Sequence, residues 1–189
     1  MLETAARRWP LDAGRPWTAV PVWTADGGQH AMDWDWLTHV LVPVAAITGG
    51  MAAGGMMIAV LGAPLLLTLP PQRYVALHQL LVTRFDPFMP ICILVALATN
   101  LALALTASRA AAQALYAVAV LLLAATVYVS LTRNVPINKW LKTLDPEALP
   151  PDFDRLLHRR VRWRNWNLVR ASFTLVALAV NGTAIGVLL

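Results

Sequence analysis

A polar, tryptophan-rich stretch lies between the last two apolar segments of the chain, and its residue types suit the binding of a small aromatic molecule. It contains Asn134-Val-Pro-Ile-Asn138-Lys-Trp140 and Arg162-Trp163-Arg164-Asn165-Trp166-Asn167, followed by Arg170. Amides orient a carbonyl or phenol by hydrogen bonding, arginine stabilises a developing enolate or phenolate, and tryptophan stacks on an aromatic ring. Because such groups are expensive to desolvate, their density beside apolar segments indicates a site as well as a membrane-facing surface.

Three of these groups and a histidine nearby in the sequence are candidate catalytic residues because they could stabilise charge or move a proton. They are His158, Arg170, Asn138 and Asn167. A further amide and three indoles are candidate substrate-binding residues, and these are Asn134, Trp140, Trp163 and Trp166. His158 is included because an imidazole exchanges its proton near neutral pH. The simpler interpretation is that the tryptophans and arginines form an interfacial belt and that the asparagines cap helix ends.

Histidines and carboxylates elsewhere in the chain are candidate ligands of an iron or copper ion, since these metals bind imidazole and oxygen donors. The candidates are His78, His158, Asp86, His39 and Asp35. The last two belong to the run His30-x-x-Asp33-x-Asp35-x-x-x-His39, just before the first apolar segment. The alternative is that these are interfacial histidines and a helix-capping aspartate. The cofactor stays open between molecular oxygen alone and a mononuclear or dinuclear iron or copper site.

The composition determines where these residues must lie. Hydrophobic residues make up 58% of the chain and charged residues only 13%, and the mean hydropathy is +0.59. A soluble domain needs more charge to cover its surface, so the chain is expected to be an integral membrane protein. Four segments are long and apolar enough to cross a bilayer as helices, at about 37–69, 88–106, 111–132 and 168–189.

These segments predict an all-α fold, an antiparallel four-helix bundle at residues 37–189, preceded by a Trp-rich interfacial extension at residues 1–36. The few residues at 107–110 force the second and third spans into a hairpin. An amphipathic helix is expected to begin at Phe153, capped by Asp152, and to lead into the last span. In contrast, Pro136 predicts a helix end or a turn between Asn134 and Asn138.

The periodicity of that last helix brings part of the polar stretch together. Trp163, Asn167 and Arg170 recur at intervals of four and three residues, so they lie on one face. On the first span, the small residues of Gly50-Met-Ala-Ala-Gly54 allow a close helix approach. We expect this ridge to pack inside the bundle; the alternative is that it forms the seam of a homo-oligomer.

Eleven of the fifteen lysines and arginines are on the side of the two long loops between spans, ten in the loops and Arg170 near the start of the last span. This bias predicts that the loops are cytoplasmic and that both termini lie outside, in a multi-pass protein of the plasma (inner) membrane. The expected partners are the lipid bilayer and a lipophilic small-molecule substrate. The chain shows no nucleic-acid-binding module, so its positive charge does not indicate DNA or RNA.

Several of these motifs together resemble the DUF1772 family of anthrone-oxygenase-like small membrane proteins, over roughly residues 40–189. They are Asn-Val-Pro-Ile-Asn, the Leu-Asp-Pro linker, Arg-Trp-Arg-Asn-Trp-Asn-Leu-Val-Arg, Tyr74-Val-Ala-Leu-His-Gln79 and Asp86-Pro-Phe-Met89. The resemblance implies a four-helix membrane bundle and oxidation of a polyketide anthrone to an anthraquinone by molecular oxygen. The family's signature positions correspond to Asn134, Pro136, Asn138, Trp163, Asn167 and Arg170. Asp86 stands where the family has Asn, and His78 where it has Gln.

Two classes of function remain after this comparison. The first is a membrane-bound monooxygenase, an oxidoreductase that acts with oxygen on a phenolic or anthrone-like substrate. The second is a non-enzymatic membrane bundle, either a transporter subunit or a protein that binds a partner or lipid. The chain contains no nucleophile elbow, Cys-x-x-Cys, dinucleotide fingerprint or His-Glu-x-x-His, so hydrolase, thiol-redox and nucleotide-dependent functions have no support.

Overall fold

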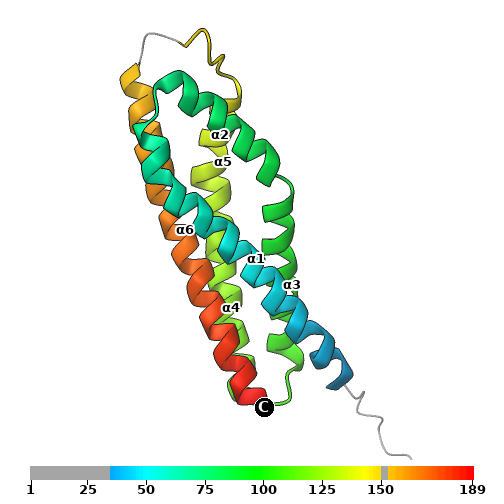
Figure 1. Ribbon diagram of the computed structural model, residues 1–189. Coiled ribbons are helices and arrows are strands. Elements are labelled where there is room, and N and C mark those ends of the chain that lie inside the picture. The colour runs from blue at the N-terminus through cyan, green and yellow to red at the C-terminus, as the bar shows by residue number, and fades with distance from the viewer. Residues whose placement is uncertain (1–34, 150–152) are drawn as a thin grey trace, which may run out of the picture. The chain divides into compact units, whose positions relative to one another are not determined.

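The computed structural model describes residues 35–149 and 153–189, and the fold is given for these residues (Figure 1). The expected Trp-rich extension lies outside the described residues, as do His30, Asp33 and the capping residue Asp152. Asp35 is described by its backbone alone.

The described chain is helical and contains no strand. Its elements are α1 (Asp35–Thr68), α2 (Pro71–Phe85), α3 (Phe88–Thr106), α4 (Ala110–Val129), the π-helical turn η1 (Ser130–Asn134), α5 (Val135–Lys142) and α6 (Phe153–Leu188). Four continuous helices are long and apolar enough to cross a membrane, at Trp36–Thr68, Phe88–Thr106, Ala110–Lys142 and Leu156–Leu188. The predicted all-α membrane bundle is therefore confirmed, and the protein is a multi-pass membrane protein.

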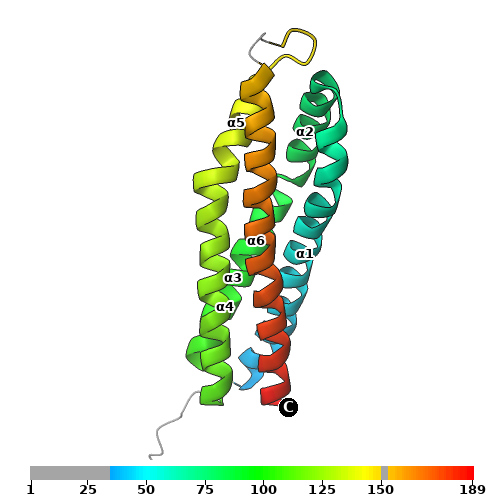
Figure 2. The ribbon, with the colours of Figure 1, turned by 90° about the vertical axis from the view of Figure 1, so that its left-hand side faces the viewer.

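The four spanning helices form a closed ring in which α1 packs on α3 and α6, and α4 packs on the same two helices. Small side chains bring the helices close, as in the cluster of Ala96, Ala119, Leu123 and Ala177. Figure 1 and Figure 2 show α2 and α5 at the end of the bundle where α6 begins, opposite the C-terminus. Polar residues of separate helices meet at that end.

The small residues of α1 pack differently from the prediction. A Cβ atom added to Gly50 or Gly54 would meet no atom within 4 Å, whereas one added to Gly55 would lie 2.5 Å from Sδ of Met89 on α3. The buried stripe of α1 instead runs through Ala45, Ala52 and Met56 to Leu66. Within the predicted Gly50 to Gly54 ridge, Ala52 and Ala53 are buried inside the bundle, but the expectation was wrong for the two glycines, because the 3.6-residue period carries them past the contact face.

The helix does not end near Pro136, so the predicted helix end or turn was also wrong. In η1 the Val135 N–H donates to the Ser130 carbonyl, five residues back, and α5 follows directly. This wider turn puts Pro136 in the first turn of α5, where a missing N–H does little harm. The polar stretch around Asn134 and Asn138 is consequently helical and continuous with α4.

Helix α6 begins at Phe153 and continues without a break to Leu188, as the sequence predicts. Its 36 residues extend for about 54 Å, well beyond the roughly 30 Å thickness of the hydrocarbon core. The apolar C-terminal part accounts for the span, so the charged first turns project beyond the hydrocarbon. These turns carry two different faces, one directed into the bundle and one directed outwards.

Candidate active site at the loop end of the bundle

Helix α2 contributes an aromatic and an imidazole side chain to the loop end of the bundle. Its sequence is amphipathic, and its buried residues are Tyr74, Val75, His78 and Val82. Tyr74 and Val75 join a hydrophobic cluster with Ile137 and Leu141 of α5 and Trp163 of α6. Burial of this apolar face fixes α2 against the ends of two spans, so His78 faces Trp163 across the cluster.

Asn138 joins these elements through a single oxygen atom. The Trp163 indole N–H donates to Asn138 Oδ1 at 3.0 Å, and His78 Nε2 lies 3.2 Å from the same oxygen. The His78 and Trp163 rings meet edge to face, with centroids 4.7 Å apart. Three residues that are far apart in sequence therefore form one hydrogen-bonded unit.

The geometry of this unit fixes the tautomer of His78. An indole N–H can only donate, so the Asn138 atom that it contacts must be the carbonyl oxygen. The imidazole nitrogen facing that oxygen must then carry the proton, which leaves the lone pair on Nδ1. Burial lowers the pKa of His78 to about 4, although the hydrogen bond to Asn138 opposes this shift. His78 is consequently a neutral imidazole at physiological pH, and the lone pair on Nδ1 is its acceptor.

Arg160 supports the same unit from α6. Its Nη2 lies 3.0, 2.7 and 3.1 Å from the carbonyl oxygens of Leu66, Leu67 and Leu69, at the C-terminal end of α1. The Leu66 oxygen also accepts the Leu69 N–H at 3.3 Å, and a guanidinium can satisfy the carbonyl groups that a helix end leaves without helical partners. Its guanidinium also lies 4.2 Å from the centre of the Tyr74 ring. Burial raises the pKa of Tyr74 although Arg160 opposes this, so its phenol remains protonated.

A second group of polar side chains lies one turn deeper on α6. Asn167 is fully buried and accepts a hydrogen bond from Arg170 Nε at 2.8 Å, and Arg170 Nη1 reaches the Ser130 hydroxyl at 3.3 Å. Asn134 is also fully buried, and its Nδ2 donates to the backbone carbonyl of Trp163 at 3.4 Å. The predicted face of Trp163, Asn167 and Arg170 thus meets the polar residues around η1.

Four buried polar atoms of these two groups have no hydrogen-bonding partner among residues 35–149 and 153–189. They are the Tyr74 hydroxyl, Asn134 Oδ1, Arg160 Nε and Asn167 Nδ2. An unsatisfied buried group costs about 1–3 kcal/mol, so in native proteins most such groups are bonded to water or to another polar group. Together these atoms offer one acceptor, two donors, and a hydroxyl that can do both.

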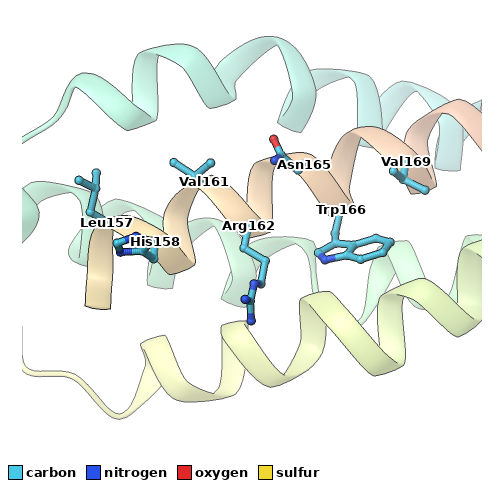
Figure 3. Close-up of a pocket in the computed structure, with 7 residues that line it drawn as sticks. All are labelled: Leu157, His158, Val161, Arg162, Asn165, Trp166 and Val169. Atoms are coloured by element: carbon cyan, nitrogen blue, oxygen red, sulfur yellow. The ribbon is translucent and has the colours of Figure 1, made fainter. Parts of the chain in front are cut away.

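His158 and Trp166 of the predicted site lie apart from this group, whereas Trp140 packs against the hydrophobic cluster that contains Tyr74 and Trp163. His158 is exposed on the outward face of α6, and it lines an open groove there together with Trp166 (Figure 3). Trp140 is covered by the Arg159 guanidinium, 4.1 Å from the ring centre. The imidazole that joins the buried amides is His78, which the sequence indicated only as a metal ligand. Tyr74 was not predicted as a site residue. It lies four residues before His78 on an amphipathic helix, and this spacing places both residues on the same buried face.

The candidate metal ligands whose side chains the structure describes are not brought together. Within the described parts of the chain, no three His, Cys, Asp or Glu side chains cluster as a metal site would require. His78 lies in the buried unit, and Asp86 forms an ion pair with Lys142 at 3.8 Å. His39 is near the start of α1, beside the packed residues Leu41 and Val42, which belong with Leu103 and Ala184 at the opposite end of the bundle. No metal step is therefore assigned to this site.

Comparison with known proteins bears directly on this end of the bundle. A family model described as anthrone oxygenase matches residues 79–180, which is more than half of the chain. The chain belongs to the anthrone oxygenase family. No curated protein and no solved structure matches it.

The match to the anthrone oxygenase family includes most of the buried polar groups. Asn134, Asn138, Trp163, Asn167 and Arg170 all fall within residues 79–180. Tyr74 and His78 lie immediately before the matched region and reach the same unit through the packing of α2. The resemblance predicted from the sequence motifs is confirmed.

Proposed function

We propose that this protein is a membrane-bound oxygenase that uses molecular oxygen to oxidise a lipophilic phenolic, anthrone-like substrate. Family membership supports an oxygenase-like role. The observation that carries the proposal further is the set of buried, unpartnered polar atoms around Trp163. Asn134 Oδ1 can accept from a phenol, and Asn167 Nδ2 can donate to a neighbouring carbonyl, so the pair is complementary to a hydroxylated aromatic ketone.

The proposed chemistry begins with removal of a proton from the methylene carbon of the anthrone. His78 Nδ1 is the proposed base, because Asn138 holds its Nε2–H and leaves Nδ1 as the only lone pair of the ring. Loss of the proton converts the ketone into an extended phenolate. Asn167, held by Arg170, would stabilise that negative charge at the oxygen.

The electron-rich carbon then reduces oxygen. One oxygen atom becomes the new carbonyl, the other leaves as water, and the balance is R₂CH₂ + O₂ → R₂C=O + H₂O. The substrate itself supplies all four electrons, so these steps require no further reductant. Trp163 would hold the flat ring system by its aromatic edge or face. With the orientation predicted from the basic residues, this site would be on the cytoplasmic side of the membrane.

The test uses full-length protein in lipid nanodiscs with anthrone as the probe substrate. We expect anthraquinone formation above the uncatalysed rate, with one oxygen consumed per quinone and one ¹⁸O atom incorporated from ¹⁸O₂. His78→Gln should abolish this acceleration, whereas His158→Gln should keep it, since His158 is exposed on the outward face. Wild-type protein that gives no acceleration over autoxidation with any hydroxylated anthrone would contradict the proposal.

A further inference from the structure

An open groove follows the outward face of the first turns of α6. Its volume is about 620 Å³, and the residues that line it are Leu157, His158, Val161, Arg162, Asn165, Trp166 and Val169. The proposed active site, with the unit of His78, Asn138 and Trp163, lies on the opposite face of α6. That face carries the buried residues Leu156, Arg160, Trp163 and Asn167. The groove shares no lining residue with the proposed active site, so it is a separate surface.

The polar end of the groove is cationic. Arg162 lines it directly, and Figure 3 shows Arg162 and Trp166 projecting on the same side of the helix. Arg133 of η1 lies with its guanidinium 5.0 Å from the centre of the Trp166 ring, which brings a second positive charge to the rim. The Arg164 guanidinium donates to Asn165 Oδ1 at 3.0 and 2.9 Å and adds a third. The lining residues include no carboxylate.

The groove becomes apolar toward the membrane. Val169 is the last lining residue along α6. Val176, two turns further along the helix, is half exposed. Leu168 and Leu175 are exposed beside this stripe. A tryptophan between arginines and an apolar stripe matches the depth at which indoles contact lipid headgroups. Leu157 and Val161 also line the outer end of the groove, but from Arg162 onwards the order along α6 is cationic, then aromatic, then apolar, as from headgroup to acyl chain in a lipid.

We propose that this groove binds one anionic phospholipid of the surrounding leaflet. Arg162 and Arg133 would bind the phosphate, since guanidiniums recognise phosphate through paired hydrogen bonds, and one acyl chain would follow Val169 and Val176. A second copy of this chain fits less well, because a symmetric contact through this face would place Arg162 against its own counterpart. The excess of positive charge selects an anionic lipid over a zwitterionic one.

The test measures binding of dioleoylphosphatidylglycerol to the full chain by native mass spectrometry, with dioleoylphosphatidylcholine as the reference lipid. Each arginine near an anionic headgroup contributes about fivefold in affinity, so Arg162→Gln should weaken phosphatidylglycerol binding about fivefold. Adding Arg133→Gln should weaken it about 25-fold. Arg73→Gln is the matched control, since Arg73 is an exposed cation on α2 and not in the groove, and it should leave the affinity of this site unchanged.

Several outcomes would overturn the proposal. An equal loss in Arg73→Gln would show only a diffuse response to net charge. Unchanged phosphatidylglycerol binding in the double variant would remove the site. A stronger dimer peak in Arg162→Gln, with lipid binding intact, would make the face a contact between copies instead. Because Arg162 and Arg133 are both exposed, these variants should fold, which circular dichroism checks.

Discussion

The two faces of α6 carry the same residue types but differ in how deeply these residues are buried. Arg160, Trp163 and Asn167 on the inward face are buried and hold defined partners. Arg162 and Asn165 on the outward face are exposed, and Trp166 is half-buried beneath Arg133. The offset between matched residues is only two or three positions. Arginine, tryptophan and asparagine are thus buried with defined partners on one face of α6 and exposed or half-buried on the other.

The largest difference is expected in the free energy of unfolding, between variants of Arg160 and Arg162. Arg160→Met should lower the free energy of unfolding by roughly 3–5 kcal/mol, because it leaves three carbonyls of α1 and the Tyr74 ring without their cation. Arg162→Met should change it by less than about 0.5 kcal/mol. Unfolding in detergent, followed by tryptophan fluorescence, measures both. Equal effects would remove the distinction between the faces.

The two asparagines should differ almost as much, but in activity. Asn167→Ala removes a buried amide whose Nδ2 has no partner in the described chain, and should lower kcat/KM about 10²- to 10³-fold if that group stabilises the developing charge. Asn165→Ala, on the outward face, should keep kcat/KM within about twofold. Steady-state anthraquinone formation by both variants tests this. Comparable losses would indicate a general effect on α6.

A smaller effect is expected from pH. His78 has a pKa of about 4 when folded and about 6.5 when unfolded, so between these values only the unfolded chain takes up the proton. Stability should therefore fall as pH decreases from 6.5 to 4, by about 2–3 kcal/mol. His78→Gln should remove this contribution, while exposed His158→Gln should retain it. Unfolding midpoints across this pH range provide the measurement, and a wild-type curve that is superimposable on that of His78→Gln would contradict it.

The smallest predicted effect extends the comparison to α1. Gly55→Ala should cost about 1 kcal/mol, because the new methyl group displaces the flexible side chain of Met89. Gly54→Ala, one position away, meets no atom within 4 Å and should be neutral or slightly stabilising. Thermal unfolding of the two variants is the comparison. Destabilisation by Gly54→Ala would indicate that the Gly50 to Gly54 ridge has a packing partner.

The parts of this architecture that could be predicted from the sequence depend only on residues close together in the chain. Hydropathy locates the four spans, and the 3.6-residue period places Trp163, Asn167 and Arg170 on one face. The same period also produces the Trp166 face, and nothing within α6 distinguishes inward from outward. That distinction depends on α2 and α5, whose His78 and Asn138 are 60 residues apart in sequence. Pro136 misled the prediction because its effect depends on the turn that precedes it.

The π-helical turn η1 makes the site sensitive to chain length as well as to side-chain chemistry. Each residue of an α-helix advances the chain by about 100° around the axis, and η1 contains the additional residue that sets the orientation of α5 relative to α4. Deleting one residue from Ser130–Asn134 would rotate α5 by about that angle and swing Asn138 away from His78 and Trp163. His78, Asn138 and Trp163 would all still be present after this deletion. The hydrogen bonds that Asn138 makes to the other two would nevertheless be lost.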